Sequence, residues 1–235
     1  MDVIKILCTD EIKRFGQNNY LIKNNDTAIL IDASAEVQAI KDNLNMFNPV
    51  PKLQAIFITH AHFDHIMRLN ELIKEFDCPV YVNKFGKEIL PSPEKNLSYI
   101  INKEFGVKDK KHLHLFKDGE EICVGDIKVK CFLTPGHSLD SSVFVIDDNM
   151  FTGDTVFKSA IGRTDLIGGS SDVIKISLLR IKNKLSQDIN NFYAGHGENF
   201  DKNTLDSVID YYIWLLKNHL QTTLFLSKKR VDKGE

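Results

Sequence analysis

The sequence lacks any long apolar run: none of its stretches approaches the roughly 18 apolar residues that a membrane-spanning helix needs. It also lacks an excess of charge of one sign, because 30 basic and 32 acidic residues leave a formal net charge of -2. No global basic field is therefore present to attract nucleic acid or an anionic membrane. The first residues carry acids and no basic leader before a short apolar run, so we expect no signal peptide.

Cysteine is scarce as well. The four cysteines are far apart and form no Cys-x-x-Cys pair: Cys8, Cys78, Cys123 and Cys131. This spacing favours buried free thiols in a reducing compartment over disulfides or a thiolate metal site. Together with the missing leader, it predicts a cytoplasmic protein with no membrane partner.

What is present is the composition of an ordinary globular protein, with 43% hydrophobic and 26% charged residues in a chain of 235. That length suits one domain with a sizeable core. We find no internal repeat and no low-complexity tract. The pattern predicts a main domain over residues 1–200, with a C-terminal helix and tail, residues 201–235, packed on the same domain.

Two periodicities alternate along the chain. Short β-rich runs predict strands at Val3–Cys8, Tyr20–Lys23, Ala28–Ile31, Ala55–Thr59, Val80–Val82, Glu121–Val124, Ile127–Leu133, Ser142–Ile146, Met150–Thr152 and Asn191–Ala194. Apolar residues three or four apart predict helices at Ala35–Phe47, Ile66–Phe76, Ser171–Leu185 and Thr204–Leu226. Residues 84–115 are charged and irregular, and we expect a short helical insert there. Two strand-rich halves with helices outside predict an α/β fold in four layers, an αβ/βα sandwich.

The most informative motif is Thr59-His60-Ala61-His62-Phe63-Asp64-His65, directly after a predicted buried strand. His60 and His62 are two residues apart, so they project the same way from extended backbone. Asp64 and His65 lie on the turn into a helix and can point back towards the same cavity. Imidazole and carboxylate are ligands that zinc, iron and manganese accept. Surface histidines in a polar loop are the alternative, but this density of ligands favours a metal site.

Three further ligand-type residues stand at later strand ends. His137, Asp154 and His196 each follow a predicted strand and lie beside a glycine, which allows backbone to pack closely around a metal cavity. Each alone would more often belong to a plain turn. In this order after the first motif, they complete a site. His112, His114 and His219 match no such pattern, and we interpret them as surface or packing histidines.

The sequence resembles the metallo-β-lactamase superfamily from about Asn19 to Gly197. The resemblance rests on four motifs in this order: HAHFDH, PGHS, GDT and GHG. The resemblance implies a four-layer hydrolase domain over residues 1–200. It implies two divalent metal ions, most often zinc, with iron or manganese as alternatives. The first ion would be held by His60, His62 and His137, and the second by Asp64, His65 and His196. The carboxylate of Asp154 would be shared by both ions. Asp32 matches the family's early strand-end aspartate and would support the ligands.

A longer stretch points to one branch of that family. Gly153–Leu166 is similar to the GDTLF…IGRTD segment of glyoxalase II-like hydrolases, and Gln17–Ile22 resembles their NCYL-type strand. The resemblance implies hydrolysis of a thioester by a metal-bridging hydroxide, with Asp64 as the catalytic residue that orients it. Lys158 and Arg163 would bind an anionic small-molecule substrate; for Arg163, an ion pair with a neighbouring aspartate is the alternative.

Departures from that branch leave the substrate open. Ile66–Arg68 stand where the family has small residues, and Leu139–Ser141 follow the third motif where it often has a glycine. Only 38 residues follow Gly197 in this sequence, and one predicted helix dominates them, so we expect no counterpart of the helical domain that carries glutathione contacts in glyoxalase II. Glutathione specificity is therefore not carried over.

Other functions fit part of the pattern. A persulfide dioxygenase shares the IGRTD-like stretch and uses one iron, held by the equivalents of His60, His137 and Asp154. A phosphodiesterase or ribonuclease of the same fold also uses two metals, but the balanced charge argues against nucleic acid. A binding module would normally have lost ligands, and all seven are present. Trp214, Leu215 and Phe225 lie off the main apolar stripe of the last helix and predict an interface in a homodimer.

Overall fold

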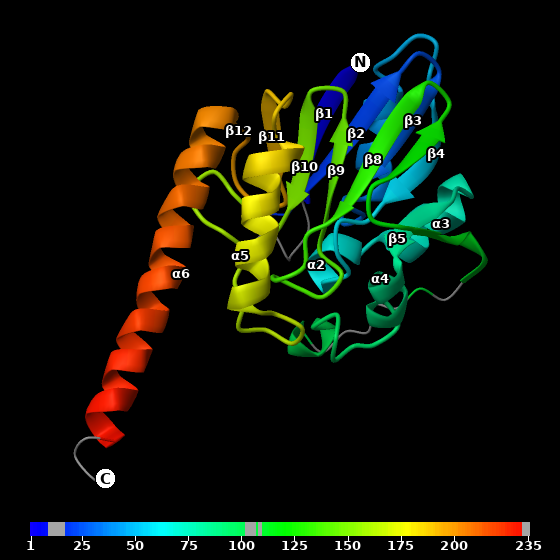
Figure 1. The fold of residues 1–235 in the computed structure, drawn as a ribbon. Helices are drawn as coiled ribbons and strands as arrows, with labels where there is room; N and C mark the ends of the chain where they lie inside the picture. Colours follow the sequence, from blue (N-terminus) through cyan, green and yellow to red (C-terminus); the bar gives the residue numbers. More distant parts are fainter. Residues whose placement is uncertain (9–16, 102–106, 108–109, 232–235) are drawn as a thin grey trace.

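The computed structural model describes the backbone of residues 1–8, 17–101, 107 and 110–231, with side chains described as far as residue 218. Its strands form two six-stranded sheets (Figure 1). The first sheet consists of β1 (Asp2–Leu7), β2 (Asn18–Asn24), β3 (Thr27–Ile31), β4 (Lys52–Phe57), β5 (Val80–Asn83) and β6 (Leu113–Phe116), in that order. The second has the order β12 (Phe200–Asp201), β11 (Asn191–Ala194), β10 (Asn149–Gly153), β9 (Ser142–Ile146), β8 (Ile127–Leu133) and β7 (Glu120–Val124).

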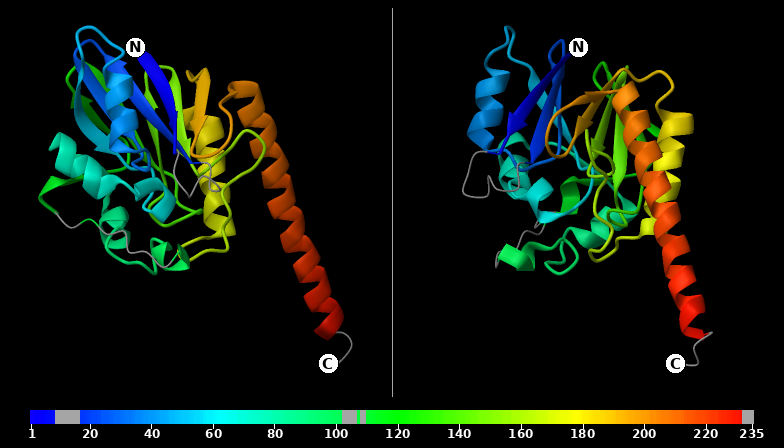
Figure 2. Two further views of the ribbon diagram at one scale, coloured as in Figure 1. Left: turned by 180° about the vertical axis from the view of Figure 1, so that it is seen from behind. Right: turned by 90° about the vertical axis from the view of Figure 1, so that its left-hand side faces the viewer.

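Helices cover the outer faces of both sheets. They are α1 (Val37–Leu44), α2 (Phe63–Ile66), α3 (Leu69–Phe76), α4 (Lys84–Ile89), α5 (Ser171–Arg180) and α6 (Lys202–Val231). One apolar core lies between the first sheet and α1 and α3, a second lies between the two sheets, and a third lies between the second sheet and α5 and α6. The two further views in Figure 2 show the same stacking. The predicted αβ/βα sandwich is confirmed.

The topology brings strand ends to one edge of the molecule. β3, β4, β5 and β6 run parallel to one another, and β10 runs parallel to β11. The carboxyl ends of neighbouring parallel strands therefore meet, and loops that follow them converge. The hydroxyl of Tyr20 donates to the carbonyl of Ala194 over 2.7 Å and so joins the sheets beside this edge.

Some sequence-based predictions were wrong in detail. Residues 84–115 are not a purely helical insert: after α4 and the short 3-10 turns Ser98–Ile101 and Lys110–His112, the chain forms β6. As an edge strand, β6 exposes its middle residues, so it lacks a strong apolar pattern. The helix expected at Ser171–Leu185 becomes a π-helix at Ile181–Leu185. Cys123 is exposed on the edge strand β7, so only three of the four thiols are buried.

The last helix, α6, packs on the second sheet through residues of its first half. Leu205, Ile209 and Ile213 are buried against the third core. Its later part, orange to red in Figure 1, runs past the body of the molecule. Among the helices that the structure describes, none combines the length and apolar character needed to cross a bilayer.

Candidate metal centre

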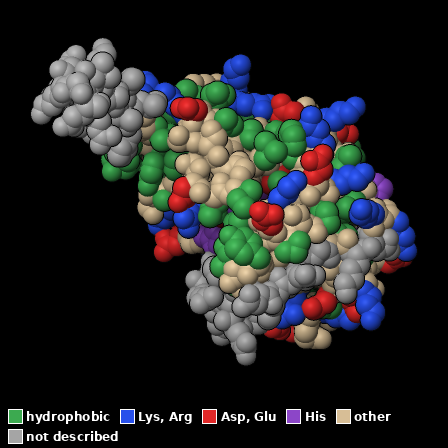
Figure 3. All heavy atoms as spheres, turned by 90° about the horizontal axis from the view of Figure 1, so that it is seen from below, with side chains coloured by type: hydrophobic (Ala, Val, Ile, Leu, Met, Phe, Trp, Pro, Cys, Tyr) green, Lys and Arg blue, Asp and Glu red, His purple; other side chains and the backbone are tan. Residues whose placement is uncertain are grey.

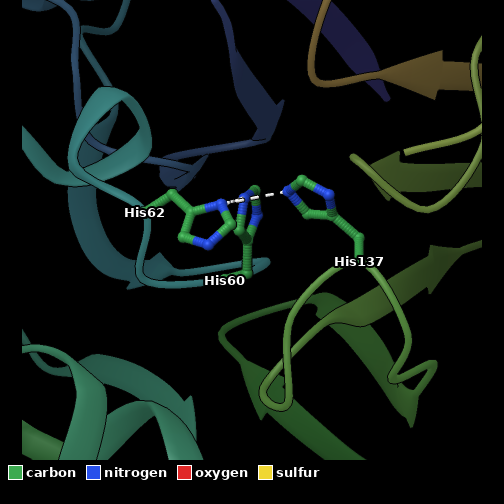
Figure 4. Close-up of side chains that lie close together, drawn as sticks. All are labelled: His60, His62 and His137. Carbon is green, nitrogen blue, oxygen red and sulfur yellow. Dashed lines mark hydrogen bonds between the residues drawn. The ribbon is translucent and has the colours of Figure 1, made fainter. Parts of the chain in front are cut away.

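Three histidines point towards one another (Figure 4). His60 and His62 lie on the connection from β4 to α2, and His137 lies on the loop between β8 and β9. Nδ1 of His62 is 3.1 Å from Nε2 of His60 and 3.0 Å from Nε2 of His137. Nitrogen ligands of a tetrahedral zinc ion lie about 3.3 Å apart when each metal–nitrogen distance is about 2.0–2.1 Å. Both distances are therefore close to the separation that such an ion requires.

A second set adjoins the first. Nε2 of His196 is 3.3 Å from Oδ2 of Asp64 and 3.3 Å from Oδ2 of Asp154. Nε2 of His65 is 3.3 Å from Oδ1 of Asp154. The carboxylate of Asp154 also approaches the first set, since its Oδ2 is 3.7 Å from Nε2 of His137. Asp154 thus lies between the two sets, and the structure brings all seven predicted side chains together.

Unsatisfied buried atoms indicate that the cluster suits cations. Nε2 of His65 and Oδ1 of Asp154 are buried and lie 3.3 Å apart, but neither has a hydrogen bond of good geometry among the described residues. A buried polar atom left without a partner costs about 1–3 kcal/mol. A divalent cation between these atoms would satisfy both. The donor set of imidazoles and carboxylates therefore fits a pair of divalent metal ions.

The electrostatics of the two sets differ. Burial, reinforced by the neighbouring His137, lowers the pKa of His62 to about 3, and burial lowers the pKa of His60 well below its usual value. These imidazoles are neutral and free to bind a metal. Burial alone would also lower the pKa of His196, but the Asp154 carboxylate overrides it and raises that pKa to about 10. The set around Asp64, His65 and His196 is therefore the anionic one, and its carboxylates stabilise a cation or a protonated imidazole.

Neighbouring groups fix the orientation of the ligand rings. Nδ1 of His65 lies 2.8 Å from Oδ2 of Asp32, whose other oxygen accepts the backbone N–H of Thr59 at 2.8 Å. Nδ1 of His137 lies 2.8 Å from the backbone carbonyl of Arg163. Each contact leaves Nε2 of the ring facing the cluster. Asp32 thus has the supporting position that the family resemblance implied.

Sequence reasoning missed two supporting side chains. Gln17 forms a β-bridge with His196, and its Nε2 lies 3.3 Å from Nδ1 of His65. Asp140 is 2% exposed, and its Oδ2 accepts the backbone N–H of Ala61, between two of the ligands, at 2.8 Å. Burial raises the pKa of this carboxyl. The sequence signals were positional: Gln17 begins the stretch that resembles the family's NCYL-type strand, and Asp140 lies where the family often has a glycine.

The two candidate substrate-binding residues are paired with acids. Arg163 donates two hydrogen bonds of 2.8 Å to Asp165, which is the alternative that the sequence left open. Lys158 pairs with Glu198. Both cations are nevertheless near the cluster, since each lines a cavity that includes one or more of the ligands. Their substrate-binding role stays a prediction.

The remaining histidines lie elsewhere. His112 contacts Asp77 through a 2.8 Å ion pair, and the ring of His114 lies 5.6 Å from that of Tyr81. The side chain of His219 is outside the described residues. The two that the structure describes are packing or surface histidines, as expected.

Two cavities open beside the cluster. One, of about 300 Å³, is lined by His62, Phe63, Asp64, Leu97, Ile100, His137, Asp154, Arg163 and Leu166. The other, of about 600 Å³, is lined by Phe157, Lys158, Ser159, Ala160, His196, Gly197, Glu198 and Thr204. In the view from below, Figure 3 shows histidine reaching the surface beside a group of hydrophobic side chains. The cluster is thus accessible to a small molecule.

The sequence matches a family model described as metallo-beta-lactamase superfamily over residues 12–206. It is 34% identical over 163 residues to "Probable metallo-hydrolase YqgX" of Bacillus subtilis, which covers 68% of this chain and 76% of that protein. It is 30% identical over 209 residues to "Probable polyketide biosynthesis zinc-dependent hydrolase PksB" of the same species, covering 89% and 84%.

Solved structures have the same fold. The crystal structure of BLEG-1 B3 metallo-beta-lactamase superposes with a TM-score of 0.76 at 25% identity, covering 90% of this chain and 99% of that one. The crystal structure of TTHA1623 in a di-iron-bound form superposes with a TM-score of 0.67 at 22% identity, covering 80% and 91%. The second likeness concerns the fold alone.

Proposed function

This chain belongs to the metallo-beta-lactamase superfamily and is an enzyme of hydrolase type, and from that premise we propose that it hydrolyses thioesters. The observation that carries the proposal is the place of the segment similar to glyoxalase II-like hydrolases. A Cβ on Gly162 would lie 1.9 Å from the carbonyl oxygen of Asp154 and 2.9 Å from Cβ of His137. The segment is therefore built against two ligands, as a substrate-determining loop would be.

We propose two divalent ions in the site, with zinc as the native metal and iron or manganese as alternatives. The ligand sets are those of the sequence interpretation, three side chains each with Asp154 shared. Zinc is supported by the name of the relative PksB, which is described as zinc-dependent. A di-iron form is known for TTHA1623, whose likeness extends to the fold. Divalent affinities for imidazole and carboxylate overlap, so metal supply contributes to the choice.

Two such ions would supply a nucleophilic water at neutral pH and an electrophile for the acyl oxygen. Asp64 is the residue that orients the water. Burial alone would raise the pKa of Asp64, but His65 pulls it below its ordinary value, so this carboxyl is ionised. As a carboxylate, Asp64 accepts a hydrogen bond and keeps one lone pair of the water directed at the carbonyl carbon. Attack breaks the carbon–sulfur bond and yields a carboxylic acid and a thiol.

The test is metal analysis combined with a substrate panel. Purified protein should contain close to two equivalents of divalent metal and hydrolyse thioesters of a panel that includes S-lactoylglutathione. A chelator should abolish turnover, and zinc should restore it. Metal-loaded protein that leaves every thioester intact would overturn the proposal. Oxygen uptake with glutathione persulfide would then indicate a dioxygenase, and cleavage of bis(p-nitrophenyl) phosphate would indicate a phosphodiesterase.

We further propose that the partner is a small molecule and that neither nucleic acid nor a membrane is bound. Lys158 and Arg163 stay candidates for anionic groups of the substrate. Alanine at either position should raise KM for a carboxylate-bearing thioester roughly 10- to 100-fold with little change in kcat. Equal losses for neutral and anionic thioesters would rule the role out. A cytoplasmic location stays a prediction from the cysteine pattern.

A further inference from the structure

We propose that the 300 Å³ cavity selects thioesters with an apolar acyl group, and that Leu97, Ile100 and Leu166 determine this selectivity. The inference rests on the proposed thioester hydrolysis. It concerns a wall of the cavity that contains no ligand of the metal cluster.

The lining of this cavity is divided by chemistry. Its floor consists of ligands, among them His62 and His137, and its wall consists of apolar side chains: Phe63, Leu97, Ile100 and Leu166. Among the described residues that line it, Arg163 is the one cation, and Asp165 already neutralises its guanidinium through two hydrogen bonds. An apolar group that enters beside the cluster thus meets a mostly apolar wall.

The wall is held in an unfavourable backbone conformation. Leu97 has φ of 63°, in the left-handed region that a leucine rarely adopts. It is nonetheless only 4% exposed and packs against Phe63 and Met67. Strain of this kind persists where the surroundings over-determine it, and it is concentrated at functional sites.

Asn96 ties this segment to the ligand loop. Its carbonyl accepts the backbone N–H of Phe63, next to two ligands, at 2.8 Å. Its side chain donates to the carbonyl of Leu90 at 3.0 Å and accepts the N–H of Ser98 at 2.9 Å. The segment that carries Leu97 is therefore fixed relative to the metal cluster, as a specificity wall must be.

Ile100 places an apolar side chain at the mouth. It is 53% exposed although it lines the cavity. An acyl chain that covered Ile100 and the half-buried Leu166 would remove apolar surface from water. Each methylene so buried stabilises the complex.

The second cavity explains why the acyl group, and not the thiol, belongs at this wall. Its lining includes polar and charged groups beside His196, among them Lys158, Ser159 and Glu198. Biological thiol carriers have amides close to the sulfur, which need hydrogen-bond partners when they leave water. Lys158, Ser159 and Glu198 can supply such partners beside His196, so the acyl arm is left to the apolar wall of the first cavity.

A chain-length series tests this inference. Acetyl, butyryl, hexanoyl and octanoyl thioesters of one thiol, N-acetylcysteamine, are compared on zinc-loaded protein. We expect kcat/KM to rise about fourfold per added methylene until the cavity is filled. Ile100→Ser and Leu166→Ser should flatten this slope. Ile176→Ser is the matched control, because Ile176 is a 68% exposed isoleucine on α5 that lines neither cavity.

Equal kcat/KM along the series, or an unchanged slope in Ile100→Ser, would overturn the inference. A second readout needs no turnover: calorimetry measures how tightly zinc-loaded protein binds a series of fatty acids, from acetate through octanoate. Affinity that rises with chain length in the wild type, but not in Ile100→Ser, supports the apolar wall. If every thioester stays intact in the same preparation, only the proposed hydrolysis is refuted. Affinity independent of chain length refutes the wall.

Discussion

At the scale of the residue, the metal cluster depends on polar side chains that never touch a metal. Asp140 is the clearest case, since its carboxylate holds the amide of Ala61 and the hydroxyl of Ser138, both at 2.8 Å. We expect Asp140→Ala to lower the free energy of unfolding by about 1–3 kcal/mol, because it leaves these buried donors unpaired. It should also weaken zinc binding, since Ala61 separates two ligands. Thermal unfolding and zinc titration measure both effects.

Asp140→Asn is the matched control, because the amide oxygen still accepts one of the two hydrogen bonds. It should lose less stability than the alanine variant. Wild-type zinc affinity in Asp140→Ala would contradict the positioning role.

A second residue-scale prediction concerns the thiols. Burial raises the pKa of Cys78 and of Cys131 to about 12, whereas Cys123 is exposed. The thiolate is the reactive form, so a buried thiol with a raised pKa is inert at pH 8. We expect a disulfide reagent such as DTNB to modify Cys123 quickly in the native protein, and all four cysteines only after denaturation. Cys123→Ser is the control, and it should lose the fast phase of the reaction. Fast reaction of several thiols in the native protein would contradict the burial of the other three cysteines.

The ligands were predictable from the sequence, whereas their supports were not. His60, His62 and Asp154 belong to dense motifs at strand ends, and parallel strand ends converge whatever the details of the loops. Gln17 and Asp140 are single polar residues in loops, and nothing in their spacing shows that they are buried. Their role depends on which backbone amide or ring lies opposite, which only the folded chain decides.

At the scale of the element, strands with a clear apolar run were predicted to within a few residues. β8 is an example, because burial of one face leaves a readable period. The strands that escaped prediction are β6 and β12, at the edges of the two sheets. An edge strand buries little, so its sequence carries little of that period. The π-helical turn after α5 also has no signal in a pattern of apolar spacing.

The loop from β10 to α5 gives the prediction at this scale. Gly162 has no room for a Cβ, since that atom would lie 1.9 Å from the carbonyl oxygen of Asp154. Gly162→Ala must therefore displace the loop and with it the Asp154 ligand. We expect metal content and turnover to fall by at least tenfold while the circular dichroism spectrum keeps its native shape. Metal analysis and steady-state kinetics measure the change.

Gly119→Ala serves as the control, because Gly119 has φ of 78° but no described atom within 4 Å of the added Cβ. That variant should lose about 1 kcal/mol of stability from backbone strain and retain its metal. Equal metal content in the two variants would show that the loop does not position Asp154.

At the scale of the whole molecule, α6 argues for a second copy of the chain. Tyr211 and Trp214 are 56% and 60% exposed on it, and its later part runs past the body. Large apolar side chains exposed side by side favour an interface, so we expect two copies to pair along α6 in an isologous dimer. Sedimentation over a range of concentrations tests this. Trp214 is the single tryptophan, and its fluorescence should shift to the blue as the dimer forms.

Trp214→Lys should favour the monomer and leave thioester turnover per chain unchanged, because Trp214 lines neither cavity. A monomer at every concentration would contradict the homodimer. Leu215 is half-buried in the structure, and the side chain of Phe225 lies outside the described residues.

The last prediction follows from how the ligands are shared between the two halves. His60, His62, Asp64 and His65 follow a strand of the first sheet, whereas His137, Asp154 and His196 follow strands of the second. Metal ions in this cluster would thus link the halves and neutralise two buried carboxylates, and they would bind the folded chain only. Such linkage adds about 4 kcal/mol when the free metal is about a thousandfold above its dissociation constant.

For a chain of this size, about 4 kcal/mol corresponds to a melting temperature roughly 10 °C higher. We therefore expect chelation to lower the melting temperature by about that amount and zinc to restore it. Asp154→Ala should respond far less to either treatment, because it lacks the shared ligand, while Ile176→Ser should respond like the wild type. A chelated protein that melts at the same temperature as the zinc-loaded one would mean that the fold holds the seven ligands together unaided, and the ions would then matter to the chemistry alone.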